Sequence, residues 1–465
     1  MNNDLAKRPN ILFLMTDEHR ADVTGFSGNS VVRTPVLDAL AQDSVIFNNA
    51  YTPSPVCVPA RQCIAAGQLP KTCGCEGWVD LAPGYMTLPR RFAENAYQTV
   101  ACGKLHHLNH DQMQGWTRRI GSDTAVDPRH IENKVDTEFA RYQRPYGDYA
   151  WNDTKEIKRA GVGSGPWVKH DAYAVEGALN LIEEHFCSPY YDREQIAPLF
   201  LKVSLMQPHF PYLTGAEKFN YYLNRVEPYV NEEKPDHPWL CQRYLEVGND
   251  VTEREVRRTT AAYYGMIETA DEHFGRVLRA LEHAGQDLDD WIIVFTSDHG
   301  EMLGEHGVWT KVKFYEGSAR VPLFIRAPKY FKGGRTVEQN VNLCDLFATL
   351  CDLAGIQPPS NLDSRSLVPL LRGEASNWDN ETLSQFGEKC LMIKRDHLKY
   401  QYLYYYETEY PEVLFDLKRD PQERVNFIDD PEYSAHVAAF RERLSELGHG
   451  RNPNPNYTNA GYHTA

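Results

Sequence analysis

The amino-acid sequence predicts an α/β fold, in which a large and mostly parallel sheet is sandwiched by helices and a smaller C-terminal α+β subdomain follows. Continuous apolar runs occupy residues 11–15 (ILFLM), 199–206 (LFLKVSLM) and 291–296 (WIIVFT), and polar residues follow each run. A strand that is apolar on both faces is typical of the centre of a parallel sheet covered by helices. Since helical patterns lie between these runs, the alternation of strand and helix indicates a layered α/β sandwich.

Helical segments are predicted at residues 34–45 and 257–285. The first, TPVLDALAQDSV, begins with Thr34 as a candidate N-cap and has Pro35 at the first helical position. The second has helical periodicity and ends at Gly285, a residue type that commonly terminates helices. Both segments are long enough to cover a sheet.

The residue composition and the hydrophobic pattern of the chain change after about residue 365. We therefore expect a large catalytic α/β domain at 1–365 and a C-terminal α+β subdomain at 366–465. Residues 390–406 are rich in aromatic side chains that partly alternate, and residues 412–421 resemble another short strand and turn. A helix is expected at 434–447. These features predict a short antiparallel sheet with a closing helix and a polar tail.

The charge of the chain argues against broad binding of nucleic acids. Lysine and arginine number 49 against 64 acidic residues, and the net charge is −15 over 465 residues. Nucleic-acid binding depends on basic surfaces that neutralise phosphates. The 42% of hydrophobic residues is ordinary for a globular protein with a sizeable core.

No membrane span and no structural zinc site are predicted. The apolar run at residues 11–15 is shorter than the core of about 7–15 residues that a signal peptide needs, so we expect a cytoplasmic protein. Its ten cysteines are then mostly reduced, and their spacing contains no paired CxxC set.

Polar side chains follow the predicted central strands. Asp17 follows the first run, His209 the second, and Asp298 with His299 the third. Ligands bind beyond the carboxyl ends of strands in such sheets, so these side chains converge if the strands are neighbours. Aspartates with a histidine suit Ca²⁺, Mg²⁺ or Mn²⁺, although a single aspartate after a strand is more often a turn or cap residue.

Cys57 lies among prolines in the segment PSPVCVPARQCIAAG, residues 53–67, at the expected start of a helix. Helix N-termini attract anions and activate thiols, and Arg61 follows one turn later. On spacing alone, an inert structural cysteine and a thiolate nucleophile both remain open.

The C-x-P-A-R pattern at Cys57–Arg61, with Gly67 six positions further on, resembles the signature of the type I sulfatase family, the formylglycine-dependent branch of the alkaline-phosphatase-like superfamily. The likeness is nearest to the choline-sulfatase-like and bacterial arylsulfatase branches, while the Asp298–His299 pair is also shared with phosphonate monoester hydrolases. Further segments that resemble family motifs are PNILFLMTDEHR (9–20), CGKLHH (102–107), MQPHFPY (206–212), FTSDHGEMLGEHGVWTK (295–311), ARVPLFIRAP (319–328) and LFDLKRDPQERVN (414–426).

The resemblance implies a nucleophile and a metal site. Cys57 would be oxidised after translation to formylglycine, whose hydrate has one hydroxyl to attack sulfur and a second to release sulfate. The family's metal ligands map, residue by residue, onto Asp17, Glu18, Cys57, Asp298 and His299. We expect one divalent cation, with Ca²⁺ first and Mn²⁺ or Mg²⁺ as alternatives.

The resemblance also implies roles for the surrounding cations and histidines. Arg61 would hold the hydrate, and Lys104 and Lys311 would stabilise charge on the sulfate. His106 would assist hemiacetal collapse, and only one of the adjacent His106 and His107 can point inward. His209 would protonate or support the leaving oxygen.

The implied function is hydrolysis of organic sulfate esters, as a sulfuric ester hydrolase. A phosphonate monoester or phosphodiester hydrolase on the same scaffold is the alternative, and a non-catalytic protein that binds sulfated ligands is the least favoured. The implied partners are a small-molecule or saccharide sulfate ester and a formylglycine-generating enzyme, and the polar tail is a candidate for contact in a homo-oligomer. Candidate pocket walls, each of which could instead be core, are Trp116, Trp167, Tyr212 and Trp309.

Overall fold

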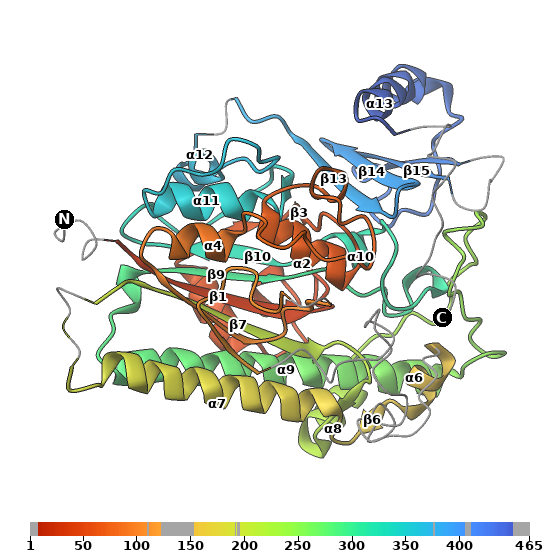
Figure 1. Cartoon of the computed structure of the whole chain (residues 1–465). Coiled ribbons are helices and arrows are strands. Elements are labelled where there is room, and N and C mark those ends of the chain that lie inside the picture. The colour runs from red at the N-terminus through yellow and green to blue at the C-terminus, as the bar shows by residue number, and fades with distance from the viewer. Residues whose placement is uncertain are drawn as a thin grey trace, which may run out of the picture.

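The computed structural model describes residues 8–108, 111–121, 153–190, 192, 196–374, 377–404 and 411–449. A large mixed sheet runs through the middle of the molecule and confirms the predicted α/β class (Figure 1). Its strand order is β11-β2-β10-β9-β1-β7-β4-β5. In that order the strands span Arg335–Val337, Val45–Phe47, Leu323–Arg326, Trp291–Ser297, Asn10–Asp17, Leu199–Pro208, Gln98–Gly103 and Arg118–Ile120.

The three apolar runs form the centre of this sheet as predicted. Strand β1 pairs in parallel with β9 on one side and with β7 on the other. Strand β10 is antiparallel to both of its neighbours, so the sheet is mostly rather than wholly parallel. Every residue of β7 and β9 is buried, because helices cover both faces of the sheet.

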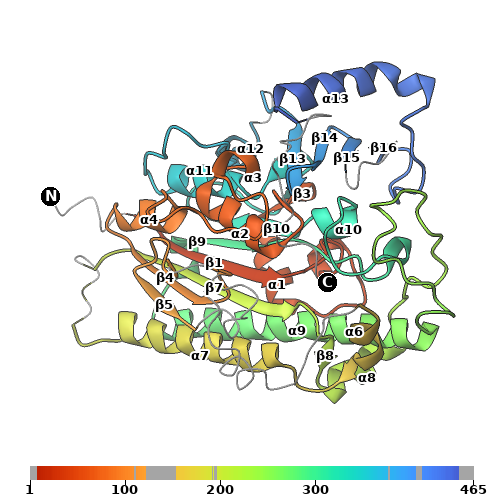
Figure 2. The ribbon, with the colours of Figure 1, turned by 45° about the vertical axis from the view of Figure 1, so that its right-hand side comes forward.

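Helices pack on the two faces in separate layers, which Figures 1 and 2 show from two directions. The long helices α7 and α9 lie on one face with α1, in a core that includes Leu12, Leu201 and Phe295. The opposite face holds α2, α4, α11 and α12, in a core that includes Phe13, Phe92 and Phe347. The helices span α1 Pro35–Gln42, α2 Cys57–Ala66, α3 Pro70–Cys73, α4 Leu88–Ala93, α6 Asp153–Arg159, α7 Pro166–Phe186, α8 Ala216–Leu223, α9 Glu253–His283, α10 Glu316–Ala319, α11 Asp345–Leu353, α12 Val368–Arg372 and α13 Ser434–Glu446.

The N-terminus of α1 differs from its prediction. Thr34 makes no side-chain cap; its hydroxyl accepts a hydrogen bond from Gly25 N and donates one to Asp38. The free N–H groups of α1 are bound instead by the carboxylate of Asp271 on α9, at 3.1 Å and 2.8 Å. A distant carboxylate thus replaces the local cap. Helix α9 has a local cap, since Thr252 and Glu255 form a capping box, and it ends before Gly285 as predicted.

The C-terminal part forms the predicted antiparallel sheet. Its strands are β13 (Glu381–Phe386), β14 (Cys390–Arg395), β15 (Leu398–Leu403) and β16 (Glu412–Asp416), with α13 packed against them. Two small sheets complete the fold: β12 (Val341–Asn342) pairs with β3 (Ala50–Tyr51), and β6 (Gly161–Val162) pairs with β8 (Leu213–Thr214). The boundary at residue 365 stays a prediction, and the tail after residue 449 lies outside the described residues.

None of the helices in the described ranges combines the length and the apolar character that a bilayer crossing requires.

Candidate active site

The polar side chains predicted at the strand ends meet at one edge of the large sheet. Asp17 ends β1, Asp298 directly follows β9, and His209 directly follows β7. Since β9, β1 and β7 are adjacent and parallel, their carboxyl ends lie together, with His209 Nε2 4.0 Å from Asp17 Oδ1. The predicted convergence is therefore confirmed.

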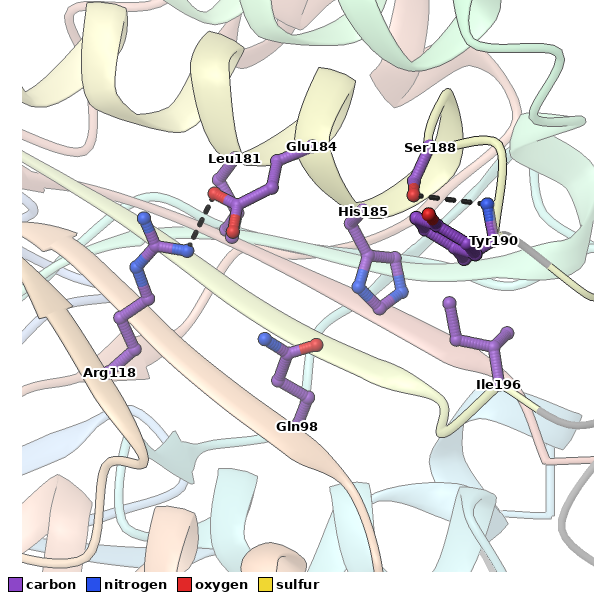
Figure 3. Close-up of a pocket in the computed structure, with 8 residues that line it drawn as sticks. All are labelled: Gln98, Arg118, Leu181, Glu184, His185, Ser188, Tyr190 and Ile196. Carbon is purple, nitrogen blue, oxygen red and sulfur yellow. Dashed lines mark hydrogen bonds and ion pairs between the residues drawn. The ribbon is translucent and has the colours of Figure 1, made fainter.

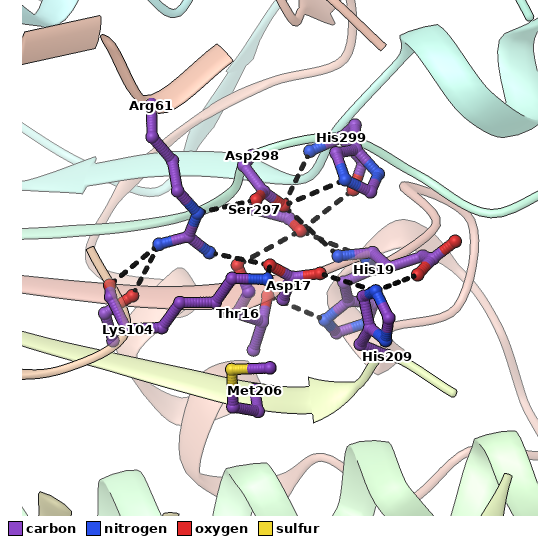
Figure 4. A network of polar contacts seen from close by, with 12 residues as sticks. Thr16, Asp17, His19, Arg61, Lys104, Met206, His209, Ser297, Asp298 and His299 are labelled. Atoms are coloured by element: carbon purple, nitrogen blue, oxygen red, sulfur yellow. Dashed lines mark hydrogen bonds and ion pairs between the residues drawn. The ribbon is translucent and has the colours of Figure 1, made fainter. Parts of the chain in front are cut away.

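The guanidinium of Arg61 joins two of these carboxylates (Figure 4). Its Nε donates to Asp298 Oδ2 at 2.7 Å and its Nη2 to Asp17 Oδ2 at 3.0 Å, while Nη1 donates to Lys104 O and Ser204 Oγ. The neighbouring carboxylates raise the pKa of Arg61 against the effect of burial. Every guanidinium nitrogen thus donates a hydrogen bond, and Arg61 holds the carboxylates of Asp17 and Asp298 in position. Its contact with a formylglycine hydrate stays a prediction.

Cys57 is the first residue of α2 and is 1% exposed. The preceding Val56 makes no side-chain cap, so the N-terminal dipole of α2 is directed at this position. The helix ends at Gly67, where φ is 63° and an added Cβ would lie 2.7 Å from Phe347 Cδ1. The glycine of the C-x-P-A-R…G motif is therefore explained by close packing at the far end of the same helix.

Cations and imidazoles surround the thiol of Cys57. Burial alone would raise its pKa, but Lys104, Lys311 and hydrogen bonds with His106 and His209 hold the pKa well below the ordinary thiol value. Lys104 also forms an ion pair with Asp17, and Lys311 Nζ lies 2.9 Å from Glu18 Oε2. The residues predicted as catalytic are thus gathered around position 57.

A group of potential metal ligands lies at the same place. One ligand atom from each of Asp17, Cys57, Asp298 and His299 lies within 4.8 Å of the others. Asp17 Oδ1 and His299 Nε2 are buried and have no hydrogen-bond partner among the described residues, and His299 Nδ1 donates to Gly300 O, which leaves Nε2 as a lone-pair donor. Unpartnered acceptors of this kind fit a divalent cation.

Glu18 belongs to a second group, with Asp17 and His209. Its backbone has φ 64°, a left-handed conformation that is rare for glutamate, and Tyr263 Oη donates to its carbonyl at 2.6 Å. The Oε2 atom of Glu18 contacts Lys311 and lies 3.3 Å from His209 Nε2. Its place as a metal ligand stays a prediction.

The structure separates the two adjacent histidines. His106, with φ 61°, faces Cys57 and meets the ring of Trp78 edge-on at 5.3 Å. The Nδ1 of His107 lies 3.0 Å from Gln112 O, and its backbone carbonyl accepts from the Gln112 side chain. His106, the histidine that matches the family motif at residues 102–107, is therefore the one that faces the site.

Sequence reasoning missed the residue that shapes the loop before Lys311. The carboxylate of Glu301 accepts hydrogen bonds from Leu303 N, Thr310 N and the hydroxyl of Tyr212. Thr310 and Val312, which flank Lys311, have φ of 61° and 76°, and such values in β-branched residues are strained. Glu301 lies in the segment 295–311 that resembles a family motif. Only its contacts in the folded chain indicate that it positions Lys311.

Most of the candidate pocket walls are core residues. Trp116 packs against Phe200, and Tyr212 and Trp309 are at most 1% exposed within another core cluster. Trp167 alone among these four lies beside the site, where its ring meets that of His209 edge-on at 6.1 Å. With Trp78 on the His106 side, half-buried tryptophans flank the site.

A separate surface pocket lies at the opposite edge of the sheet (Figure 3). It is lined by Gln98 and Arg118, which begin β4 and β5, and by Glu184 and His185 of α7. Because the predicted ligands lie at the carboxyl ends of the strands, this pocket at the amino ends is not the site.

Comparison with known proteins identifies the family. Residues 9–356 match the family model described as Sulfatase. The chain belongs to the sulfatase family. Residues 304–450 of this sulfatase also match the model described as N-sulphoglucosamine sulphohydrolase, C-terminal. Membership of the family makes the chain an enzyme that hydrolyses sulfate esters.

Relatives align with the sulfatase over nearly its whole length. An arylsulfatase of Clostridium perfringens is 30% identical, covering 96% of this chain and 95% of that protein. A choline-sulfatase of Rhizobium meliloti is 32% identical, covering 94% and 86%. Among solved structures, a phosphonate monoester hydrolase of Agrobacterium radiobacter superimposes with a TM-score of 0.75 at 24% identity, covering 95% of each chain, which supports the fold.

Proposed function

We propose that this sulfatase hydrolyses organic sulfate esters of small molecules or saccharides with residue 57 as formylglycine and one divalent cation. The cation would be held by Asp17, Asp298, His299 and residue 57, with Glu18 as a further candidate. The observation that carries the proposal is the pair of unpartnered buried acceptors, Asp17 Oδ1 and His299 Nε2, beside Cys57. Because carboxylate oxygens dominate, Ca²⁺ is the preferred ion, with Mn²⁺ and Mg²⁺ as alternatives.

When present, the hydrated formylglycine supplies a nucleophilic hydroxyl and a second hydroxyl for sulfate release, and the cation supplies Lewis acidity. The chain itself supplies charge and proton transfer. Lys104 and Lys311 attract the sulfate group and stabilise its charge in the transition state. His106 and His209 flank residue 57 and are placed to move protons at that side chain and at the leaving oxygen.

The burial of Cys57 indicates the stage at which it would be oxidised to formylglycine. With 1% of its surface exposed, the thiol is inaccessible to a second protein in the folded chain. We therefore propose that a formylglycine-generating enzyme acts before folding and reads the flexible segment around Cys57. The expected cytoplasmic location and the homo-oligomer remain predictions.

The alternative substrate class, phosphonate monoesters, is tested by comparing a sulfate and a phosphonate ester that share the same leaving group. The purified enzyme should show a kcat/KM for 4-nitrophenyl sulfate that exceeds its value for 4-nitrophenyl phenylphosphonate by at least tenfold. The alternative rests on the Asp298–His299 pair, which the resemblance also associates with phosphonate monoester hydrolases. A preference for the phosphonate would reverse the assignment.

Replacing Lys311 with alanine should lower kcat for 4-nitrophenyl sulfate by about 10²–10³-fold, the usual effect of losing one donor that stabilises transition-state charge. The matched control is Lys329→Ala, because Lys329 lies on the surface and, within the described ranges, forms an ion pair with Asp290 alone. Steady-state kinetics of both variants provide the measurement. An unchanged kcat in Lys311→Ala would remove this lysine from the chemistry.

A further inference from the structure

The turn that follows β1 leaves the ladder of the large sheet. Pairing of β1 with β9 ends at Thr16, and the register of β1 with β7 shifts between Met15 and Asp17. Residues 18–20 are nevertheless buried, each with at most 3% of its surface exposed. Buried backbone N–H and C=O groups need hydrogen-bond partners, so side chains of other elements have to supply them at this turn.

One hydroxyl provides partners for two of these backbone groups. Tyr263 Oη donates to Glu18 O at 2.6 Å and accepts from Arg20 N at 2.9 Å. The hydroxyl therefore closes the turn from its first residue to its third, with its one proton and one of its lone pairs. Because φ of Glu18 is 64°, the turn has a strained conformation, which persists where surrounding groups over-determine it.

The core sets the position of this hydroxyl. Tyr263 is fully buried in α9, and its ring belongs to a core cluster with Tyr212, whose ring centroid lies 6.3 Å away. Helix α9 has a capping box at its N-terminus and lies along one face of the sheet (Figure 1). Two further contacts of the turn, from Glu18 N to Asp298 Oδ1 and from His19 N to Ser297 Oγ, come from the end of β9 and the residue after it. Tyr263 thus fixes the turn from outside the two groups of potential metal ligands.

Two candidate metal ligands depend on this turn. Asp17 belongs to both groups of potential ligands, and Glu18 belongs to the second group with His209. The direction of each carboxylate follows from the backbone dihedrals at residues 17 and 18, which the contacts of the turn determine. Partners that orient metal ligands typically change metal affinity by about 10–100-fold when they are removed.

We propose that Tyr263 is a positioning residue for the metal site, whose hydroxyl holds residues 18–20 so that the carboxylates of Asp17 and Glu18 face the cation. The inference rests on the proposed function, because the cation is part of that proposal. Within the described ranges the hydroxyl bonds to backbone atoms alone, so Tyr263 acts through the turn rather than on the substrate. Its loss therefore weakens metal binding and leaves the side chains that carry out the chemistry in place.

The test is Tyr263→Phe, which removes one oxygen atom and keeps the ring. Chelator-treated wild-type and variant proteins are titrated with Ca²⁺ in a calorimeter, with Mn²⁺ and Mg²⁺ in parallel, and the Kd of the tightest-binding cation is compared. This Kd is expected to rise by about 10–100-fold in the variant. At saturating cation, kcat for 4-nitrophenyl sulfate should return to within about fivefold of the wild-type value, because the groups that stabilise the transition state are unchanged.

Tyr264→Phe is the matched control. Tyr264 is the next residue of α9, and its hydroxyl accepts a hydrogen bond from Asn29 Nδ2 at 3.1 Å. The control also loses one buried hydroxyl contact, but at a distance from the turn, and it should leave the Kd of the cation within about twofold, as expected for a hydrogen bond that affects stability alone. Thermal unfolding of both variants in the presence of chelator reports the stability of the metal-free proteins.

A merely structural Tyr263 would give a different result. A lower metal-free Tm with an unchanged Kd, or a Tyr263→Phe protein that fails to fold, would assign the hydroxyl to stability and overturn the positioning role. Weaker binding in the variant, together with a wild-type protein that hydrolyses no sulfate ester, would support the positioning role and refute the proposed function. A wild-type protein that binds none of the three cations would overturn both.

Discussion

Cys57→Ala protein is expected to fold normally and to lose at least about 10⁴-fold in kcat for 4-nitrophenyl sulfate, as enzymes do when their nucleophile is removed. The fold should survive because the surrounding cations keep other partners: Lys104 stays paired with Asp17, and Lys311 with Glu18. The expected change in Tm is within about 3 °C, since only a small side chain is lost. Steady-state kinetics and thermal unfolding of the same preparation provide the measurement.

A cysteine on the same helix is the matched control. Cys63 lies in α2 within a cluster of buried cysteines, where its Sγ is 3.7 Å from Cys73 Sγ, and it is not a member of either group of potential metal ligands. Cys63→Ala should retain kcat within about threefold even if Tm falls, because cavity effects act on stability rather than on chemistry. Mass spectrometry of the wild-type peptide should show an aldehyde at residue 57. Substantial turnover in Cys57→Ala would place the nucleophile elsewhere.

Asp298→Asn is expected to lose the bound divalent cation and to lower kcat by about 10³-fold, equivalent to several kcal/mol of Lewis-acid stabilisation. The Asp298 carboxylate is fully buried, binds Arg61 through Oδ2 and accepts from the backbone N–H groups of Glu18 and His299 through Oδ1. An amide keeps much of this shape but removes the negative charge that a cation requires. Metal content by plasma mass spectrometry and kcat are measured on the same sample.

Asp271→Asn is the control for this change. Asp271 is also a buried carboxylate that accepts two backbone hydrogen bonds, but it caps α1 and has no part in the ligand group. Burial raises its pKa to about 7, so a neutral amide is a mild replacement. The control should keep its full metal content and kcat. Asp298→Asn protein with one equivalent of metal and normal turnover would contradict the proposed metal site.

The central strands and the residues that follow them were predictable because their signals are local. A run that is apolar on both faces, such as residues 291–296, predicts a central strand without knowledge of which strands pair with it. The polar residue that follows the run then lies at the end of the strand. The motif around Cys57 likewise placed the cysteine at the first position of a helix. The carboxylates and histidines of the candidate site were predictable for the same reason, because each of them directly follows such a local signal.

Other predictions failed where a distant segment competed with a local signal. Thr34 has the residue type of an N-cap, yet Asp271 of α9 reaches the same N–H groups. For Trp116, Tyr212 and Trp309 the sequence left pocket wall and core as alternatives, and the packing of other elements buries them in the core. Glu301 and Tyr263 carried no signal of their own, because hydrogen bonds to a loop and to a strained turn are created only by folding.

The sequence by itself determined which segments become central strands, where α2 begins, and which carboxylates and histidines stand at strand ends, since hydrophobic period and turn chemistry act over a few residues. The tertiary structure alone decided that β9, β1 and β7 are neighbours and that Arg61 joins Asp17 to Asp298. These relations join residues far apart in the chain. They arise because burial of the whole core, rather than any local preference, selects one arrangement of the segments.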